Sequence, residues 1–425
     1  MTYSEAKHFL FSLGNEVLTA KLGLERIQTV LAHFGNPERA YRVVHVAGTN
    51  GKGSTCAMID AGLRAAGIRT GLYTSPHLIE PTERIQVDGM PVSQELFTRA
   101  FETIHQAAAE LNLDCHPTYF ETVTAMAFWI FREMGVETAV VEVGLGGRLD
   151  ATNVVQPALT VITPVDLDHQ AWLGDTIEQI AAEKAGILKP GVPAIVATQH
   201  PAALAVIERR AADLHVPITH RHSAAIDDVT LLDRGLSLKL DGTPIHSRLP
   251  GEHQVENTVV AALALKHLGI DPRGLSEARW PGRLEHVLPN PDVILDGAHN
   301  PAGARALASY LLRFYRERPV TIVFGAMRDK AIADVLRELV PAAQEFLFTA
   351  PAGDRAAKPE DLVLLAKQLG VQHCSAFATP AAALDEIQRR AELRDTTDSV
   401  YVFTGSLFLV GEARELFLNR IFVKW

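Results

Sequence analysis

The chain has few cysteines and lacks the marks of an exported or membrane-spanning protein. Its three cysteines, Cys56, Cys115 and Cys374, are far apart and form no CxxC pair. Neither a structural zinc site nor a disulfide framework is therefore expected. No apolar run approaches the ~20 residues that span a bilayer, and the first residues, MTYSEAKHFLFSLGNE, carry charges. These absences favour a cytoplasmic protein that does not bind membranes.

An excess of positive charge is also missing. The net charge is −10 and 21% of the residues are charged, which argues against a nucleic-acid partner but leaves room for a small anionic substrate in a local pocket. With 425 residues, 47% of them hydrophobic, the chain can form two or three domains of ~100–200 residues each.

Strand-like runs alternate with helical patterns along most of the chain. The runs YRVVHVA, RTGLYT, ETAVVEV, ALTVITP and PAIVAT are separated by helical stretches such as TIEQIAAEKAGIL. This alternation predicts an α/β fold with a parallel sheet covered by helices. Residues 223–250 instead alternate like antiparallel strands, which suggests a hairpin excursion.

A domain boundary is expected near residues 284–292. The segment LEHVLPNPD places two prolines and an asparagine before a new strand, VILD. Beyond it, PVTIVFG, EFLFTA and SVYVFTG are strands separated by helical segments. We expect a parallel-sheet domain over residues 1–284 and a smaller Rossmann-like α/β domain over residues 285–425.

The segment GTNGKGS resembles a phosphate-binding loop with unusual spacing. Only two residues separate Gly48 from Gly51, and Gly53 stands between Lys52 and Ser54, whereas the common loop has four intervening residues and a Lys-Ser/Thr pair. The physical parts are still present: glycines for a tight turn, N–H groups at a helix N-terminus and a mobile cation. Phosphate binding is favoured over a glycine turn with a solvated lysine.

Polar side chains follow several of the predicted strands. Ser75 follows RTGLYT, Glu142 lies near the end of ETAVVEV, and Asp166, Asp168 and His169 follow ALTVITP. Ligands of open parallel sheets collect at the carboxyl ends of the strands, so these groups could together hold one or two Mg²⁺ ions that bridge nucleotide phosphates. Taken singly, each has an ordinary structural explanation.

The glycines of EVGLGGRLD form an incomplete dinucleotide fingerprint. Gly144 and Gly146 fit G-x-G-x-x-G, but Leu149 replaces the third glycine. A nicotinamide cofactor is not expected.

Lys184 lies near the end of a predicted helix. Thr176 and Gln179 form a capping box, and Gly186 is a plausible helix end. From the residues alone, Lys184 is explained by the helix dipole, which favours a cation in the last turn.

The second domain repeats the pattern of polar turns after strands. Arg283 lies in WPGRLE, and Asp296 and His299 lie in DGAHNP, which is also typical of a simple Asp-Gly turn. Lys330 in FGAMRDK and Ser406 in FTGSLFL are further candidates.

Taken together, these stretches resemble the folylpolyglutamate synthase and dihydrofolate synthase family, a branch of the Mur ligase superfamily. The shared motifs cover nearly the whole chain in the family's order: HVAGTNGKGST, YTSPHL, TYFE, EVGLGGRLDATN, LDHQAWLG, IAAEKAGILKPGVP, PGRLE and DGAHNP. The resemblance implies a Mur-ligase-like ATP-binding domain and a C-terminal glutamate-ligase domain. It also implies ATP-dependent formation of an acyl phosphate on a folate or pteroate carboxylate, which the amine of L-glutamate then attacks.

The resemblance also implies roles for individual residues. The lysine that the family carbamylates with CO₂ is matched by Lys184, which would help to hold a second Mg²⁺ ion, and Lys52, Lys184 and His299 are the catalytic candidates. The nucleotide would be bound by Gly51, Lys52, Gly53, Ser54, Asn257, Arg283 and Asp296, and Mg²⁺ by Ser75, Glu142, His169 and Lys184.

The acid and glutamate sites are inferred in the same way. The pterin would contact Leu22, Thr118, Phe120, Asp150 and Ala151, and glutamate would draw on His299, Lys330 and Ser406. The form LGGRLDATN is associated with members that also accept dihydropteroate, although Lys21 stands where bifunctional relatives often have an acid. We expect a bifunctional, monomeric enzyme that uses dihydropteroate, tetrahydrofolate polyglutamates and L-glutamate. The alternatives are a monofunctional folylpolyglutamate synthase, a Mur-type ligase for another acid, and an inactive nucleotide-binding module.

Overall fold

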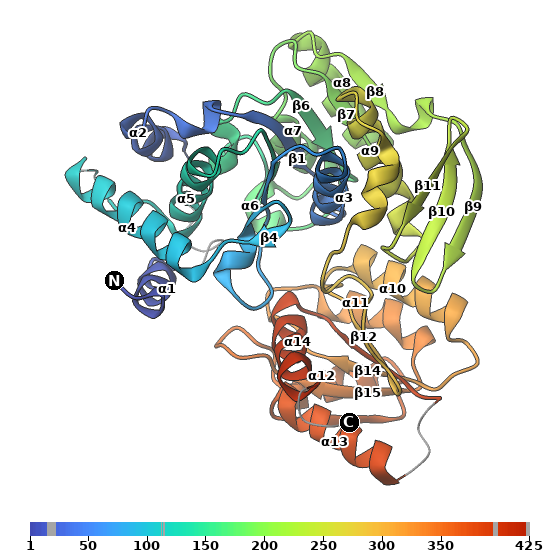
Figure 1. The fold of residues 1–425 in the computed structure, drawn as a ribbon. Coiled ribbons are helices and arrows are strands. Elements are labelled where there is room, and N and C mark those ends of the chain that lie inside the picture. The colour runs from blue at the N-terminus through green and yellow to red at the C-terminus, as the bar shows by residue number, and fades with distance from the viewer. Residues whose placement is uncertain (15–22, 112, 114, 394–397, 422–425) are drawn as a thin grey trace. The chain divides into compact units, whose positions relative to one another are not determined.

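The chain forms two compact units. The computed structural model describes residues 1–14, 23–111, 113, 115–393 and 398–421. The first unit comprises Met1–Thr230, Ser237–Arg248 and Gln254–Arg279, and the second comprises Leu231–Leu236, Leu249–His253 and Trp280–Trp425 (Figure 1).

The first unit is built on an eight-stranded sheet. Its strands, in spatial order, are β4 (Met90–Pro91), β3 (Ile85–Val87), β2 (Thr70–Tyr73), β5 (Thr138–Glu142), β1 (Arg42–Ala47), β6 (Leu159–Ile162), β7 (Ala194–Val196) and β8 (Ile218–His220). The six strands from β2 to β8 in this order run parallel, and β3 and β4 continue the sheet antiparallel. The predicted parallel sheet is confirmed, and β3, β4 and β8 are additional strands.

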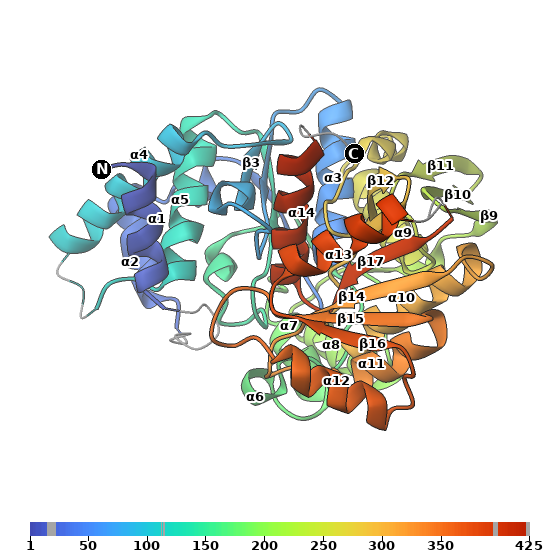
Figure 2. The same cartoon turned by 90° about the horizontal axis from the view of Figure 1, so that it is seen from below.

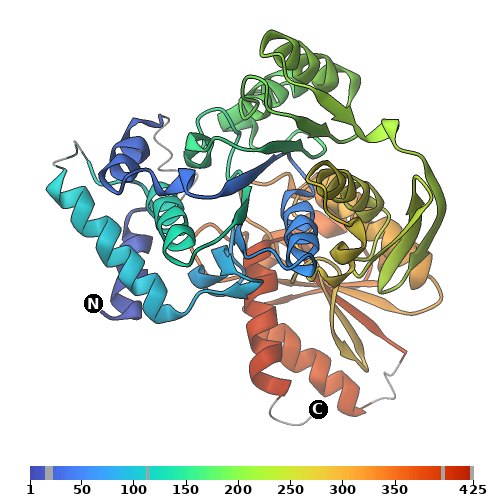
Figure 3. The same ribbon diagram turned by 45° about the horizontal axis from the view of Figure 1, so that its top comes forward.

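Helices cover both faces of this sheet. They are α1 (Tyr3–Ser12), α2 (Glu25–His33), α3 (Lys52–Ala65), α4 (Gln94–Glu110), α5 (Tyr119–Glu133), α6 (Gln170–Leu173), α7 (Ile177–Ala185), α8 (Pro201–Asp213) and α9 (His253–His267). Ala139 and Val141 of β5 point into an apolar cluster with α4 and α5. Because side chains alternate along a strand, Val140 points to the other face, where α3 packs on β5. Figure 3 shows α5 and α3 on opposite sides of these strands.

The alternating segment at residues 223–250, predicted as a hairpin, forms a separate three-stranded sheet. Its spatial order is β11 (Thr243–Ser247), β10 (Gly235–Leu240) and β9 (Ile226–Leu232). The turn between β9 and β10 falls within Leu231–Leu236, which belong to the second unit.

The second unit contains a six-stranded sheet, seen from another side in Figure 2. Its order is β12 (Glu285–Pro289), β13 (Asp292–Leu295), β17 (Val400–Thr404), β14 (Val320–Phe324), β15 (Glu345–Thr349) and β16 (Cys374–Phe377). The helices are α10 (Pro301–Phe314), α11 (Ile332–Leu339), α12 (Pro359–Gln368), α13 (Pro380–Leu393) and α14 (Leu407–Ile421). Helices α10, α11 and α12 pack on the face that carries Val402. On the opposite face, the ring of Phe403 lies edge-on to Phe417 of α14, with centroids 5.6 Å apart. The predicted second α/β domain is confirmed.

The segment LEHVLPNPD, where a domain boundary is predicted, contributes to a hairpin. Most of it forms β12, which pairs antiparallel with β13, Glu285 opposite Leu295 and Pro289 opposite Asp292. Strand β12 lies at the edge of its sheet, where a proline without an N–H group is tolerated because one side of the strand needs no ladder bonds.

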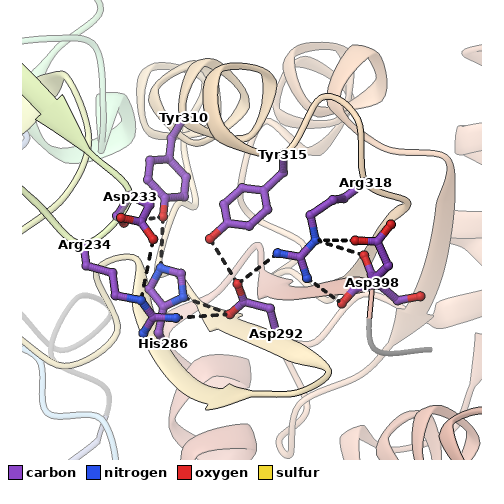
Figure 4. A network of polar contacts seen from close by, with 9 residues as sticks. Asp233, Arg234, His286, Asp292, Tyr310, Tyr315, Arg318 and Asp398 are labelled. Carbon is purple, nitrogen blue, oxygen red and sulfur yellow. Dashed lines mark hydrogen bonds and ion pairs between the residues drawn. The ribbon is translucent and has the colours of Figure 1, made fainter. Parts of the chain in front are cut away.

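A buried polar network holds the start of β13 in the second unit (Figure 4). The carboxylate of Asp292 accepts hydrogen bonds from His286 Nδ1 at 2.9 Å and Tyr315 Oη at 3.1 Å. His286 Nε2 lies 2.9 Å from Tyr310 Oη, which donates to the carbonyl oxygen of Asp233 at 2.7 Å. Burial alone would raise the pKa of Asp292, but hydrogen bonding and the charge of His286 hold that pKa below its ordinary value.

Candidate active site

The glycine-rich loop joins β1 to α3, as the sequence predicts. Strand β1 ends at Ala47, and α3 begins at Lys52 with Gly51 as its N-cap. The first N–H groups of a helix have no partner within the helix and favour an anion there. Lys52 Nζ donates to the carbonyl oxygen of Thr49 at 3.2 Å, so this cation folds back over the loop that it follows.

Two positions in the loop require glycine. Gly48 has φ +153°, and a Cβ there would lie 1.8 Å from Thr163 Oγ1. Gly51 has φ +84°, and its Cβ would lie 2.2 Å from Asn257 Oδ1. The loop is therefore pressed between the segment after β6 and helix α9, and any side chain would displace one of them.

Lys184 lies beneath this loop and is buried, with only 4% of its surface exposed. Its Nζ donates to the carbonyl oxygen of Gly48 at 2.8 Å. The predicted capping box of Thr176 and Gln179 is present, and Gly186 is the C-cap of α7. Burial, reinforced by the nearby charge of Lys52, lowers the pKa of Lys184 to about 7. A surface lysine that only balances a helix dipole would not have this environment.

Ser75 and Glu142 lie together at the carboxyl ends of neighbouring strands. Tyr73 of β2 pairs with Val141 of β5, so the residues that follow emerge side by side. The backbone N–H of Ser75 donates to Glu142 Oε2 at 3.2 Å, and Glu142 is 4% exposed.

His169 follows β6 after several intervening residues. Strand β6 ends at Ile162, and His169 is the N-cap of α6 with φ +52°. Its backbone N–H donates to Asp168 Oδ1 at 2.8 Å. Asp168 also contributes to the electrostatic environment of Lys184, which links this turn to the loop region.

The donors near the loop fit Mg²⁺ in chemical type. Glu142 supplies a buried carboxylate and Ser75 a hydroxyl, the oxygen ligands that Mg²⁺ prefers. Across the described part of the chain, no three His, Cys, Asp or Glu side chains gather into a metal cage. The predicted set contains only two residues of these types, and Mg²⁺ commonly takes its other ligands from phosphates and water.

The predicted pterin residues line two turns that are held by their own hydrogen bonds. Thr118 caps α5 through a capping box with Glu121, and Arg26 pairs with Glu121 at 2.9 Å. Phe120 packs where a Cβ on Gly144 would lie, 2.5 Å from its Cζ. Leu22 lies outside the described residues, as does Lys21.

The carboxylate of Asp150 holds the turn that precedes the buried Ala151. Oδ2 of Asp150 accepts from the N–H of Leu145 at 2.8 Å, and Oδ1 of Asp150 accepts from the N–H of Thr152 at 3.0 Å. Burial raises the pKa of Asp150, and these hydrogen bonds oppose the shift. Thr152 Oγ1 also bonds Asp150 and lies 2.9 Å from Nε2 of the fully buried His45. No pattern in the sequence indicated this buried chain of hydrogen bonds.

The glycines of EVGLGG serve close packing. A Cβ on Gly147 would lie 2.7 Å from the carbonyl oxygen of Glu183, and one on Gly186 would lie 2.4 Å from Arg148 Cβ. These contacts bring the turn against α7 and explain Gly147 and Gly186 by close packing.

The predicted residues of the second unit also follow adjacent strands. The N–H of Asp296 donates to the carbonyl of Phe403, and the N–H of Gly405 donates to the carbonyl of Ala298, both at 3.0 Å. The turn with Asp296 and His299 therefore lies beside the turn with Ser406. Lys330 follows β14, which pairs with β17.

Asp296 is held by the backbone of its own unit. Its carboxylate accepts from the N–H groups of Leu284 at 2.9 Å and Ala298 at 3.0 Å. Burial raises its pKa, and the charge of Arg283 opposes that shift. Nδ1 of His299 lies 2.9 Å from the carbonyl oxygen of Gly297, which sets the orientation of the ring.

Gln254 is a site neighbour that the sequence analysis missed. It is 1% exposed, and its Nε2 donates to Ser54 Oγ at 3.2 Å. The available signal was its spacing of three residues from Asn257, which places both amides on one face of a helix.

The fold and the loop define a Mur ligase: the family model for the Mur ligase middle domain matches residues 46–265, and that for the Mur ligase glutamate ligase domain matches residues 282–407. Among relatives, the dihydrofolate synthase/folylpolyglutamate synthase of Bacillus subtilis is 35% identical over 97% of this chain and 98% of its own. That of Escherichia coli is 34% identical over 94% and 92%. The chain belongs to the folylpolyglutamate synthase/dihydrofolate synthase family.

Solved structures agree with this assignment. Mycobacterium tuberculosis folylpolyglutamate synthase complexed with ADP has a TM-score of 0.91 at 33% identity, covering 98% of both chains. Escherichia coli FolC in complex with DHPP and ADP has a TM-score of 0.86 at 31% identity, covering 99% of both. Within the described residues, no helix is long and apolar enough to span a membrane.

Proposed function

We propose that this chain is an ATP-dependent ligase that joins L-glutamate to dihydropteroate and to reduced folates and their polyglutamates, through an acyl phosphate. The observation that carries the proposal is the full-length similarity to enzymes named dihydrofolate synthase/folylpolyglutamate synthase. The buried lysine directly beneath the phosphate loop supports it independently.

In this proposal the loop binds the ATP phosphates. The N–H groups of Gly51, Lys52, Gly53 and Ser54 face the phosphates, and the ammonium of Lys52 neutralises charge as the γ-phosphoryl group moves to the acid's carboxylate. ADP leaves, the amine of glutamate attacks the acyl carbon, and phosphate leaves. Asn257, Arg283 and Asp296 are the proposed contacts to the rest of the nucleotide.

Lys184 is the proposed site of carbamylation. With a pKa of about 7, about half of the amine is neutral at neutral pH, compared with roughly one part in a few thousand for an ordinary lysine. The neutral nitrogen attacks the carbon of CO₂, a C–N bond forms, and one proton is released to solvent. The product is an anion in place of a cation beside the loop.

The oxygen donors Ser75 and Glu142, with His169 and the carbamate of Lys184, would hold one or two Mg²⁺ ions. When bound, these ions screen the charge of the phosphates during transfer. The hydrogen bond from the N–H of Ser75 to Glu142 supports this assignment, because it brings the two residues together.

The proposed pterin site comprises Leu22, Thr118, Phe120, Asp150 and Ala151, and the proposed glutamate site comprises His299, Lys330 and Ser406. The ATP- and pterin-binding part would occupy residues 1–284 and the glutamate-ligase part residues 285–425. We further propose that the enzyme acts as a monomer.

The test is ATP turnover by the purified chain with Mg²⁺ and L-glutamate, with dihydropteroate and tetrahydrofolate supplied separately. Glutamate-dependent ADP release is expected with both acids. Release with tetrahydrofolate alone would reduce the assignment to a monofunctional synthase. Turnover with neither acid would reject the proposal and point to a different acid or to a nucleotide-binding module without ligase activity.

A further inference from the structure

We infer that Gln254 is a positioning residue that fixes the hydroxyl of Ser54 and ties it to Asn257. This inference rests on the proposed nucleotide site, because Ser54 and Asn257 are the groups on which Gln254 would act. All three residues belong to the first unit.

Two hydrogen bonds form a continuous chain through the Gln254 amide. Asn257 Nδ2 donates to Gln254 Oε1 at 3.0 Å, and Gln254 Nε2 donates to Ser54 Oγ at 3.2 Å. All three side chains are buried, with 4%, 1% and 3% of their surfaces exposed, respectively. A buried amide is costly unless it is hydrogen-bonded, and Gln254 directs both ends of its amide to residues of the proposed site.

The two amides give this hydrogen-bond chain a direction. Asn257 Nδ2 donates to Gln254 Oε1, and Asn257 Oδ1 faces Gly51, where a Cβ would lie 2.2 Å away. Oε1 of Gln254 must then accept, which leaves Nε2 to donate toward Ser54. Ser54 Oγ is consequently an acceptor in this contact, and its own proton points elsewhere.

The hydrogen bonds that join Asn257, Gln254 and Ser54 lie at one end of a longer packing interface between α3 and α9. One turn further along α9, Thr258 Oγ1 lies 3.5 Å from Met58 Sδ. Further on, Leu265 packs against the backbone at Gly62, where a Cβ would lie 2.3 Å from its Cδ1. Gln254 therefore differs from the rest of the interface because it contacts the loop end of α3 through a polar group.

A fixed Ser54 hydroxyl has a consequence for nucleotide binding. Without the bond from Gln254, the serine side chain can rotate, and ordering it again must then accompany binding of the phosphates. Loss of the Gln254 amide is expected to weaken nucleotide binding about tenfold, the scale of one or two hydrogen bonds.

The experiment compares Gln254→Met with Thr258→Val, which removes a buried polar contact at the same helix interface without touching the loop. ADP affinity is measured by calorimetry with Mg²⁺, and folding by thermal melting. We expect ADP to bind about tenfold more weakly to Gln254→Met and within about twofold of wild type to Thr258→Val. Equal ADP affinity in the two variants would overturn the inference.

A double-mutant cycle separates positioning from general packing. If Gln254 acts through Ser54, then Gln254→Met should change ADP affinity by less than about twofold in a Ser54→Ala background. A full tenfold loss in that background would show that Gln254 does not act through Ser54. Gln254→Glu provides a second variant that still accepts from Asn257 but cannot donate to Ser54 when ionised, and it should bind ADP at least as weakly as Gln254→Met because its carboxylate also repels the phosphates.

The proposed function and the role of Gln254 are rejected by different results. Wild-type protein that binds ADP but shows no glutamate-dependent turnover would reject the ligase proposal and leave the role of Gln254 standing. Wild-type turnover together with unaltered ADP affinity in both Gln254 variants would reject the role of Gln254 and leave the ligase proposal standing.

Discussion

Replacing Lys184 with methionine should stabilise the protein at neutral pH, and the gain should shrink as the pH rises. The folded protein holds the pKa of Lys184 at about 7, whereas the ordinary value is 10.5. The unfolded state therefore binds more protons between these two values, so the stability of the wild type rises with pH across that window. Below about pH 7 both states are protonated and the cost of burial is at its largest.

The magnitude follows from the two pKa values. Relative to a side chain that is neutral in both states, burying Lys184 costs about 4 kcal/mol at pH 7 and about 2 kcal/mol at pH 9. The variant also loses the hydrogen bond from Nζ to the carbonyl of Gly48, a loss of about 1 kcal/mol that does not change over this range. The net gain for Lys184→Met is about 3 kcal/mol at pH 7 and about 1 kcal/mol at pH 9.

The assay is chemical unfolding of wild type and variant at pH 7, 8 and 9 in CO₂-free buffer, so that no carbamate forms. The difference between the two proteins should fall by about 2 kcal/mol over this range. Lys367→Met, on the exposed surface of α12, controls for the loss of a lysine as such. A wild-type-to-variant difference that stays constant from pH 7 to 9 would refute the reasoning.

Four further changes test the site and the fold. Glu142→Gln should leave melting unchanged but lower ATP turnover about 100-fold, because an amide is a poor Mg²⁺ ligand; wild-type rates at limiting Mg²⁺ would contradict this. Lys184→Arg cannot form a carbamate and should lose turnover similarly, unless the lysine serves only as a cation. Gly51→Ala should weaken ADP binding more than Gly67→Ala, which shares a positive φ of +79° but has no neighbour within 4 Å; equal affinities would remove the contact with α9 from the explanation. Asp292→Asn should cost about 3 kcal/mol at pH 7, and because the folded pKa of Asp292 is depressed, urea titrations should show the difference shrinking as the pH falls below about 4.

Much of the site could be predicted because parallel strands end at one edge of a sheet. The residues after β2 and β5 had to emerge together once the two strands were neighbours, and Ser75 and Glu142 do so. The glycines of the loop likewise predicted a tight turn before α3. The individual roles of these residues, and the domain boundary at residue 284, stay predictions.

Other features could not be read from local patterns. The prolines and asparagine of LEHVLPNPD indicated a domain boundary but not a strand, and β12 forms because it is an edge strand with a partner in β13. His169 follows β6 as predicted, but its place as the N-cap of α6 was not apparent from the sequence. The role of Gln254 could not be predicted from its place in a largely apolar helix, because that role depends on contact with Ser54, which is 200 residues away in the chain.

The sequence by itself determined the alternation of strands and helices, the phosphate loop and the family, because these depend on residue order and local spacing. Only the tertiary structure decided that the pKa of Lys184 is lowered. Its place in the last turn of α7 is explained locally by the helix dipole. Folding buries the amine beneath Gly48 and beside Lys52, and removal from water penalises the charged form far more than a helix dipole favours it.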